Sequence, residues 1–270
     1  MIYHDGKQPF WNKLIVLLLQ TSFTMSYYIV VNILLLVITF NGNSDGALNK
    51  RIVNGTTTAD GQFPYQVSLT LNGQHLCGGS ILNTRWILTS PYCFIVLITF
   101  KAVVGTNALN ANGDIYQVES YIKHPLFNPN TKDYAAGLLN TTTPIVYSNK
   151  VQPIALTPLL PIDGTVAVVA GWGPNDPSSE IPINTLTSLK TTVINYTNCQ
   201  NRLLSKNFTL TSTHICTFVE QAGICSYDYG GAVSVCNLQF GIALIPNCGT
   251  GFPDIHTKIS SVYSWILYII

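Results

Sequence analysis

The sequence predicts an all-β fold, either a sandwich or a barrel, that ends in a single helix. Residues 63–69 alternate between apolar and polar side chains and lead into an Asn72-Gly73 turn. Two further runs, Ser80–Leu88 and Ile95–Val104, are apolar and β-branched, with glycine and asparagine between the strands. Short strands separated by turns are typical of β-sandwiches and β-barrels. At the end of the chain, apolar residues recur at helical spacing and predict a docking helix: Ile259, Val262, Tyr263, Ile266 and Ile270.

Composition places the chain among globular proteins and excludes one class of partner. Its 270 residues, of which 47% are hydrophobic, can bury one large core or two smaller ones. A formal net charge of +1 and a charged fraction of 9% leave no basic face, so we exclude nucleic-acid binding. The seven cysteines, all between Cys77 and Cys248, show no metal-ligand spacing, and we expect neither a metal nor a cofactor. With several glycosylation sequons, they favour an oxidising compartment.

The amino terminus indicates export. Apolar runs at Leu14–Leu19 and Tyr27–Phe40 precede a small, polar stretch, Asn41–Ala47, which suits signal cleavage. We therefore expect a leader over residues 1–47 and a secreted protein. Met25 is an alternative true start, because it opens a more ordinary signal peptide. The competing interpretation is a membrane anchor, which would apply if the hydrophobic segment stayed uncleaved.

The stretch Gly223–Ala232, which reads G-I-C-S-Y-D-Y-G-G-A, is a sharp turn of the kind that an acyl-transfer site uses. Cys225, Asp228 and the Gly230-Gly231 pair resemble the nucleophile loop of chymotrypsin-like serine proteases, C-x-G-D-S-G-G-P. Tyr229 stands at the nucleophile position. Tyr227 stands where the family has the glycine that lends one N–H to the oxyanion hole, the second N–H coming from the position of Tyr229.

The resemblance covers nearly all of Ile52–Ile270, because four further landmarks follow in the family's order: Cys77–Leu82, Lys150–Ile154, Ala170–Gly173 and Pro253–Ile259. It implies an all-β fold of two antiparallel six-stranded barrels, packed face to face with a cleft between them, and a C-terminal helix. The expected domain then spans residues 52–270.

The resemblance also implies activation by cleavage. Arg51 precedes Ile52-Val53-Asn54-Gly55 and resembles the family's activation site, which makes residues 48–51 a short propeptide. Cleavage after Arg51 would free the Ile52 amino group to pair with Asp228, since a buried carboxylate needs such a partner. The alternative is that Arg51 is an ordinary exposed loop residue.

The other two catalytic positions differ from the family as well. Thr89-Ser90-Pro91-Tyr92-Cys93 stands at T-A-A-H-C and places Tyr92 at the base position, where a phenol that titrates near pH 10 cannot serve as a base near neutrality. Ala135 matches the orienting aspartate if Leu138-Leu139 and Pro144 are aligned with the family, and Asp133 would then be a solvated loop carboxylate. The five histidines are expected to be satisfied or solvated: His4, His75, His124, His214 and His256.

The substrate pocket is altered in two ways. Gly223, at the position of the pocket base, gives no charge to attract Lys or Arg, and Ile224 beside it is apolar. Leu244-Ile245-Pro246 replaces the family's S-W-G, with one residue fewer before Cys248. Because proline cannot donate to a β-ladder, an extended peptide would lose a main-chain partner there.

The resemblance implies three disulfides: Cys77–Cys93, Cys199–Cys216 and Cys225–Cys248. Cys236 is left over, and we favour a buried small hydrophobe over intermolecular pairing. Sequons at Asn140, Asn195 and Asn207 are expected in surface segments and glycosylated. A glycan on the fourth, Asn54, would crowd the inserting terminus.

The sequence thus predicts a secreted, monomeric serine protease homologue without catalytic residues, a pseudoprotease. It would act by binding proteases, inhibitors or other secreted proteins as a cofactor, decoy or scaffold. The alternative is an active chymotrypsin-like endopeptidase with an unusual constellation, such as Tyr229 as nucleophile, and family membership is its only support.

Overall fold

A computed structural model describes residues 55–94 and 100–270. The expected leader, Arg51, Ile52 and the Asn54 sequon lie outside the described residues, as does the first half of the expected strand Ile95–Val104. No helix within the described ranges is both long enough and apolar enough to cross a membrane.

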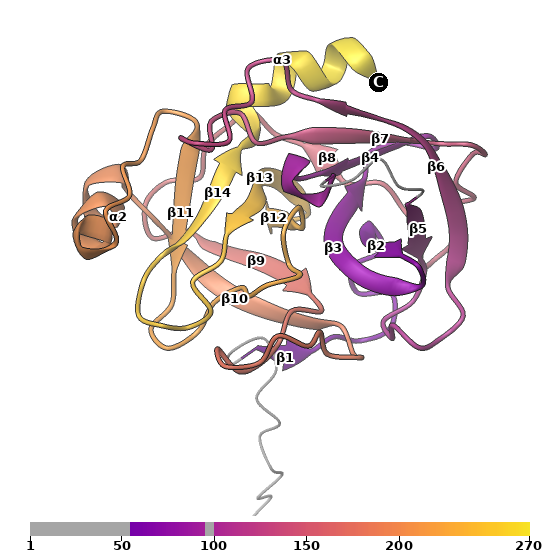
Figure 1. The fold of residues 1–270 in the computed structure, drawn as a ribbon, viewed down its shortest axis with the longest axis horizontal. Helices are drawn as coiled ribbons and strands as arrows, with labels where there is room; N and C mark the ends of the chain where they lie inside the picture. Colours follow the sequence, from indigo (N-terminus) through magenta and orange to yellow (C-terminus); the bar gives the residue numbers. More distant parts are fainter. Residues whose placement is uncertain (1–54, 95–99) are drawn as a thin grey trace, which may run out of the picture. The chain divides into compact units, whose positions relative to one another are not determined.

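Six strands of the first half close into an antiparallel barrel in the order β2-β3-β4-β7-β6-β5 (Figure 1). Their bounds are β2 Gln66–Leu71, β3 Gln74–Ile81, β4 Trp86–Thr89, β5 Lys101–Val104, β6 Asp114–Lys123 and β7 Gly137–Thr141. The expected run Ser80–Leu88 is therefore divided between the end of β3 and the start of β4. Asn72 and Gly73 both have positive φ and form the tight turn between β2 and β3, as the sequence predicts.

Six strands of the second half form a second antiparallel barrel, in which β10-β11-β14-β13-β12-β9 is closed by pairing of β9 with β10. The strands are β9 Val166–Gly171, β10 Thr187–Ile194, β11 His214–Phe218, β12 Ala232–Val235, β13 Leu238–Ile245 and β14 Asp254–Lys258. Two short strands are attached, β1 Thr56–Thr57 to β10 and β8 Ala155–Leu156 to β13. The predicted two-barrel fold is confirmed.

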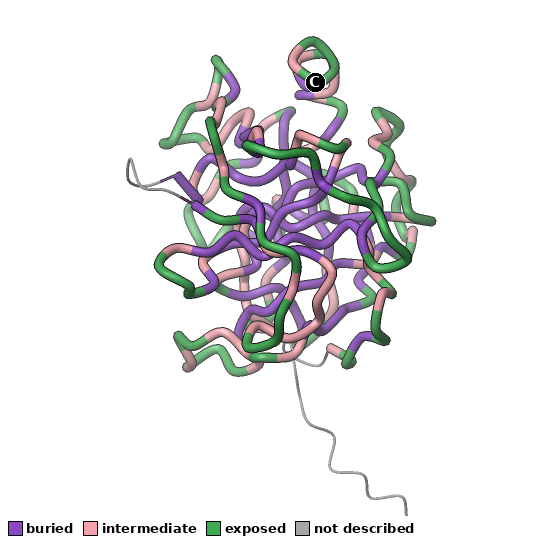
Figure 2. The backbone as a smooth tube through the Cα atoms, turned by 90° about the vertical axis from the view of Figure 1, so that its right-hand side faces the viewer, coloured by how far each residue is buried: buried purple, intermediate pink, exposed green. Residues whose placement is uncertain are grey.

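Each barrel encloses its own apolar core, which Figure 2 shows as buried backbone surrounded by exposed loops. Val67, Ile81 and Leu139 are among the residues that fill the first, and Val169, Val233 and Phe240 are among those that fill the second. The C-terminal helix α3, Ile259–Ile269, joins a third cluster to which both barrels contribute. Its residues Ile259, Val262 and Ile266 are buried, so the expected docking face is present, although Ile270 remains 38% exposed.

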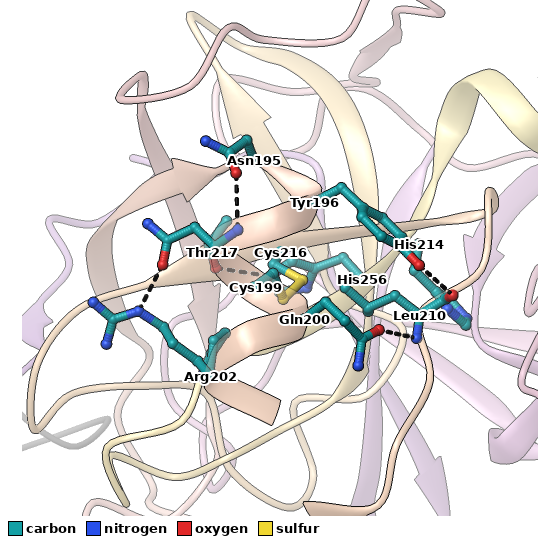
Figure 3. Close-up of a disulfide and its surroundings, with 12 residues drawn as sticks. Asn195, Tyr196, Cys199, Gln200, Arg202, Leu210, His214, Cys216, Thr217 and His256 are labelled. Atoms are coloured by element: carbon teal, nitrogen blue, oxygen red, sulfur yellow. Dashed lines mark hydrogen bonds between the residues drawn. A yellow bond between two sulfur atoms is a disulfide. The ribbon is translucent and has the colours of Figure 1, made fainter. Parts of the chain in front are cut away.

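A second helix, α2, spans Tyr196–Leu203 and was not predicted from the sequence. Only Cys199 and Leu203 of this helix are buried, and two buried residues leave no amphipathic pattern to detect. Figure 3 shows what fixes it: the Asn195 side chain caps its first turn by accepting from Asn198 N at 2.9 Å, and the Cys199–Cys216 disulfide ties it to β11. The 3₁₀ helix η2, Leu204–Lys206, follows directly.

The structure contains the three expected disulfides, Cys77–Cys93, Cys199–Cys216 and Cys225–Cys248. The expectation for Cys236 is wrong, because this free cysteine is exposed. Cys236 and Asn237 have φ values of 49° and 60° and make the two-residue turn between β12 and β13. A turn residue projects beyond the sheet, so the thiol cannot join the core.

The three described sequons differ in their surroundings. Asn195 and Asn207 are exposed, as expected of surface segments. Asn140 is not in a surface loop but in β7, paired with Trp86 and Ser120, and its side-chain oxygen is buried. Asn140 is therefore only partly exposed, and its glycosylation stays a prediction.

Candidate functional site

The loop 223–231 enters the interface between the barrels and is held from both sides. The Cys225–Cys248 disulfide fixes its start, and Gly230 N donates to Ala243 O at 2.8 Å in the second barrel. From the first barrel, Gly78 N donates to Tyr229 O at 2.9 Å. Gly230 has a φ of 81°, and a Cβ there would clash with Thr89 Oγ1, so only glycine fits. The backbone of the predicted nucleophile loop is thus tightly specified.

Tyr227 adopts a left-handed backbone conformation with a φ of 74°. This is the position where the resemblance expects a glycine, and a non-glycine residue in this region costs about 1–2 kcal/mol. Its carbonyl oxygen accepts from His75 Nε2 at 3.1 Å, and the two rings lie 6.3 Å apart between centroids. The loop therefore keeps a glycine-like turn although it carries a bulky ring.

Tyr229 is half-buried and packs against the core of the first barrel. Burial raises the pKa of its phenol above the ordinary value of 10. The hydroxyl is therefore protonated near neutral pH, and no ionised oxygen is present to attack a carbonyl.

Tyr92 lies in the 3₁₀ helix η1, Pro91–Cys93, whose N-cap residue is Ser90. Its hydroxyl donates to Pro129 O at 3.0 Å, and its ring meets Phe127 edge to face at a centroid distance of 5.3 Å. Burial, and secondly the neighbouring Tyr229, raises the pKa of the Tyr92 phenol. Tyr92 is consequently a fixed hydrogen-bond donor rather than a proton acceptor.

Ala135 is fully buried, and its carbonyl oxygen accepts from Thr257 Oγ1 at 3.1 Å. Asp133 differs from the expected solvated carboxylate. It accepts hydroxyl hydrogen bonds from Thr131 at 2.6 Å, from Thr213 at 2.7 Å and from Thr211. Because Thr211 and Thr213 precede β11, the carboxylate connects the two halves of the molecule. These donors lower its pKa, although desolvation acts in the opposite direction.

Of the histidines that the structure describes, only His214 lies close to both a hydroxyl and a carboxylate, and it belongs to the same cluster. His214 Nδ1 lies 3.2 Å from Thr211 Oγ1 and accepts from Thr211 N at 3.2 Å, while His214 Nε2 donates to Lys132 O at 3.2 Å. The Thr211 hydroxyl already directs its proton to Asp133. Both ring nitrogens are thus occupied by the backbone, and the imidazole cannot activate the hydroxyl. The cluster is therefore structural, and we call it the Asp133 clip; it comprises Thr131, Asp133, Thr211, Thr213 and His214.

The remaining described histidines are buried and hydrogen-bonded as well. His75 Nδ1 lies 2.7 Å from Ser68 Oγ, His124 Nδ1 accepts from Leu126 N at 3.2 Å, and His256 Nε2 lies 2.8 Å from Thr217 Oγ1. Burial lowers the pKa of His75 to about 4 and that of His256 to about 3. Both are neutral at physiological pH. His4 lies outside the described residues.

Asp228 is buried beneath the loop. One carboxylate oxygen accepts from Gly173 N at 2.7 Å and the other from Cys225 N at 2.9 Å. A Cβ on Gly171 or Gly173 would overlap this carboxylate, so glycines at both positions make room for it. Burial raises the pKa of Asp228 to about 6 and outweighs the two backbone donors.

The base of the expected substrate pocket contains a residue that sequence reasoning missed. Asp254 is only 4% exposed, and its carboxylate accepts from Ile224 N at 3.0 Å and from Asn247 N at 2.8 Å. A Cβ on Gly223 would lie 3.0 Å from one of its oxygens. A buried carboxyl group therefore lies directly beside Gly223, which the residue at position 223 itself does not predict. Burial raises the pKa of Asp254 to about 7, opposed by its two backbone donors and supported by Asp228.

The carboxylate of Asp254 joins two segments of the chain, because Ile224 N and Asn247 N both donate to it. Cys248 N also donates directly to Ile224 O at 2.9 Å. Leu244 is buried, and Pro246, half-buried, follows the end of β13. The available signal was an aspartate between Pro253 and Ile255, at the start of the buried strand β14.

A cleft of about 430 Å³ lies between the barrels and brings the three tyrosines together. Its described lining comprises Leu76, Cys77, Tyr92 and Lys132 from the first half, Glu180, and Ser226, Tyr227, Tyr229, Leu244 and Ile245 from the second. Within residues 55–94 and 100–270, no three His, Cys, Asp or Glu side chains are arranged to hold a metal ion. The cleft can offer aromatic and aliphatic surface, one ammonium and one carboxylate.

Comparison with known proteins agrees with this architecture. The family profile described as Trypsin matches residues 52–266. Chymotrypsin-2 of Vespa crabro is 32% identical over 224 residues, covering 80% of this chain and 98% of the relative. Trypsin of Sus scrofa is 30% identical over 224 residues, covering 80% and 94%, and Trypsin alpha-4 of Lucilia cuprina is 27% identical over 229 residues, covering 82% and 88%. With two barrels, a matching profile and relatives at this identity, the chain belongs to the trypsin family.

Proposed function

We propose that this protein is a secreted, non-catalytic member of the trypsin family that acts by binding other proteins. The observation that carries the proposal is that burial raises the pKa of the Tyr92 and Tyr229 phenols, which the resemblance assigns to the base and nucleophile positions. Acyl transfer needs a group that accepts a proton near neutral pH and a small oxygen or sulfur nucleophile. Both phenols hold their protons there, and the Tyr92 hydroxyl is engaged with Pro129 O.

Two further features support a site without turnover. Ala135 supplies no carboxylate to orient a base, and Tyr227 brings a ring to the turn from which an oxyanion would be held. The Asp254 carboxylate joins two segments of the chain beside Gly223, and Pro246 cannot donate to a peptide backbone. Substrate anchoring and chemistry are thus both impaired.

Binding remains a function that the scaffold can perform. We propose proteases, their inhibitors or other secreted proteins as partners, and a monomeric protein. The three disulfides are typical of extracellular proteins, which supports removal of the leader at residues 1–47 and secretion. The exposed Asn195 and Asn207 are the sequons best placed to carry glycans.

We further propose that cleavage after Arg51 matures the protein. The support is Asp228, a buried carboxylate whose described donors are two backbone N–H groups. The ammonium group of a new Ile52 terminus would neutralise it, as the resemblance implies, and would lower its pKa from about 6.

The test is covalent labelling. Protein cleaved after Arg51 is incubated with a fluorophosphonate probe, with pig trypsin as the positive control, and we expect no labelled residue. A reversal variant, Tyr92→His with Ala135→Asp and Tyr229→Ser, serves as the second control. We expect it to hydrolyse peptides poorly, because Tyr227 and Pro246 remain. Labelling of a serine in the wild-type protein would refute the proposal.

The second candidate is an active endopeptidase, which the names of the relatives favour, since they are trypsins and a chymotrypsin. It would require an unusual nucleophile such as Tyr229. Turnover of a broad peptide library by the wild-type protein, lost on Tyr229→Phe, would establish this candidate in place of the first.

A further inference from the structure

The cleft between the barrels contains two charged side chains, although most of its lining is apolar or aromatic. Of the described residues that line it, Lys132 is the one cation and Glu180 the one anion. A neighbouring hollow of about 590 Å³ is also lined by Leu76, Glu180 and Tyr227, so the two spaces adjoin along these residues. Glu180 therefore faces both spaces, whereas Lys132 lines only the cleft that contains Tyr92 and Tyr229.

The backbone holds Lys132 in place. Its φ of 64° is left-handed, as is the φ of 51° at Tyr134, so two strained residues flank Asp133. Lys132 N donates to Asn128 O at 2.7 Å, and Lys132 O accepts from His214 Nε2 at 3.2 Å. The Asp133 clip secures the next residue. These contacts hold Lys132 in a strained backbone conformation, and such strain is typical of residues at functional sites.

The ammonium group of Lys132 is directed over the Tyr92 ring, with Nζ 5.0 Å from the ring centroid. Contact with an aromatic face localises an ammonium while leaving its N–H groups available for an anion. The nearby hydroxyl of Tyr92 is committed to Pro129 O. Leu76, Leu244 and Ile245 provide the apolar wall of the same cleft.

We propose that this cleft binds a polypeptide segment through its side chains rather than by main-chain pairing: the carboxylate of an acidic residue pairs with Lys132, while an adjacent apolar residue contacts Leu76, Leu244 and Ile245. The proposal rests on the non-catalytic function above and names the class of partner. Charge complementarity carries it, because Lys132 is the one cation among the described lining residues and its ammonium group lies over the Tyr92 ring. Glu180, the one described anion of the lining, would repel a second acidic residue of the segment.

The proposal is tested with three fluorescently labelled peptides, Ala-Leu-X-Leu-Ala, in which X is Glu, Gln or Lys. Their affinities for the wild-type protein and two variants are measured by fluorescence anisotropy. Lys132→Glu reverses the cleft charge. Lys206→Glu is the matched control, because Lys206 Nζ also lies over an aromatic ring, 4.2 Å from Phe252, but outside the cleft lining. We expect the Glu peptide to bind about tenfold more tightly than the Lys peptide, since a hydrogen bond to a charged group contributes about that factor.

The preference should reverse in Lys132→Glu, persist in Lys206→Glu and weaken with salt. Equal affinities, a preference that both lysine variants change alike, or no binding of any peptide at 1 mM would overturn the inference. Chromatography of the peptides after incubation separates the two proposals. Cleaved peptide would refute the non-catalytic function, whereas intact peptide without a Lys132-dependent preference would refute only the partner class.

Discussion

Replacement of Asp254 by asparagine should change how the stability of the protein depends on pH. The Asp254 carboxylate is buried and has two backbone N–H donors, Ile224 and Asn247. Desolvation nevertheless dominates and raises its pKa from 3.8 to about 7. Because the folded-state pKa is above the unfolded value, the folded protein binds more protons between these two values. Stability from this group is therefore highest below pH 3.8 and is lost as the pH rises towards 7.

The size of the effect follows from linkage. Between pH 5 and pH 8, a shift from 3.8 to about 7 removes about 2–3 kcal/mol of unfolding free energy. His75 and His256 act in the opposite direction, because their lowered pKa values make stability rise as the pH increases towards 6.5. The wild-type profile alone therefore cannot isolate Asp254. The difference between the variant and the wild type does.

Urea unfolding of wild type and Asp254→Asn at pH 5 and pH 8 measures that difference. At pH 5 the variant should be less stable by about 1–3 kcal/mol, because one backbone N–H then faces the amide NH₂ group instead of an oxygen. At pH 8 this deficit should shrink by about 2–3 kcal/mol or change sign, since the variant buries no charge. A deficit equal at both pH values would show that Asp254 titrates normally, and the account of the pocket base would be wrong.

Three further predictions concern the loop, the Asp133 clip and the free thiol. Gly230→Ala should lower the unfolding free energy, measured in urea, by about 2–5 kcal/mol, because the new Cβ clashes with Thr89 and the backbone is left-handed. Gly164→Ala is the control, since Gly164 has a φ of 85° and no atom lies within 4 Å of its Cβ. It should lower the unfolding free energy by only about 1–2 kcal/mol. Similar costs would argue against the clash. Asp133→Ala should lower the unfolding free energy by about 1–2 kcal/mol at pH 7 and by less below pH 3.8. The reason is that a carboxyl group with a lowered pKa contributes stability that is lost as the carboxylate is protonated. A loss of stability that is the same at every pH would contradict this. Iodoacetamide should modify one thiol of the native protein, and Cys236→Ser should abolish the reaction. An unmodified native protein would contradict the exposed position of Cys236.

Much of the fold could be predicted because its signals are local or ordered along the chain. The Asn72-Gly73 turn and the apolar face of Ile259, Val262 and Ile266 each follow from neighbouring residues. Helix α2 could not be predicted in this way, because a capping asparagine and a disulfide stabilise it rather than an apolar stripe. The sequence pattern cannot report a helix whose stability comes from such single contacts.

The candidate site was predicted only where one position decides its chemistry. Tyr92 and Tyr229 were chosen from the loops that resemble the family, and both line the same cleft, although their assigned roles stay a prediction. Asp254 was missed because it lies 31 residues after Gly223 in the chain, and only the closed barrel brings its carboxylate to the pocket base. The role of Asp133 depends likewise on hydroxyls almost 80 residues away. Contacts between the two halves therefore set the limit of sequence reasoning here.

Tyr92, which the resemblance assigns to the base position, makes contacts with several neighbouring groups. Its hydroxyl holds Pro129 O, its ring packs on Phe127, and it supports the ammonium group of Lys132. A histidine at this position is shorter and could not make all three contacts at once. Reintroducing it would loosen the segment that Asp133 fastens to the second barrel, before any question of proton transfer arises. The surroundings of Tyr92 thus favour a fixed binding surface over a site that must exchange protons in each catalytic cycle.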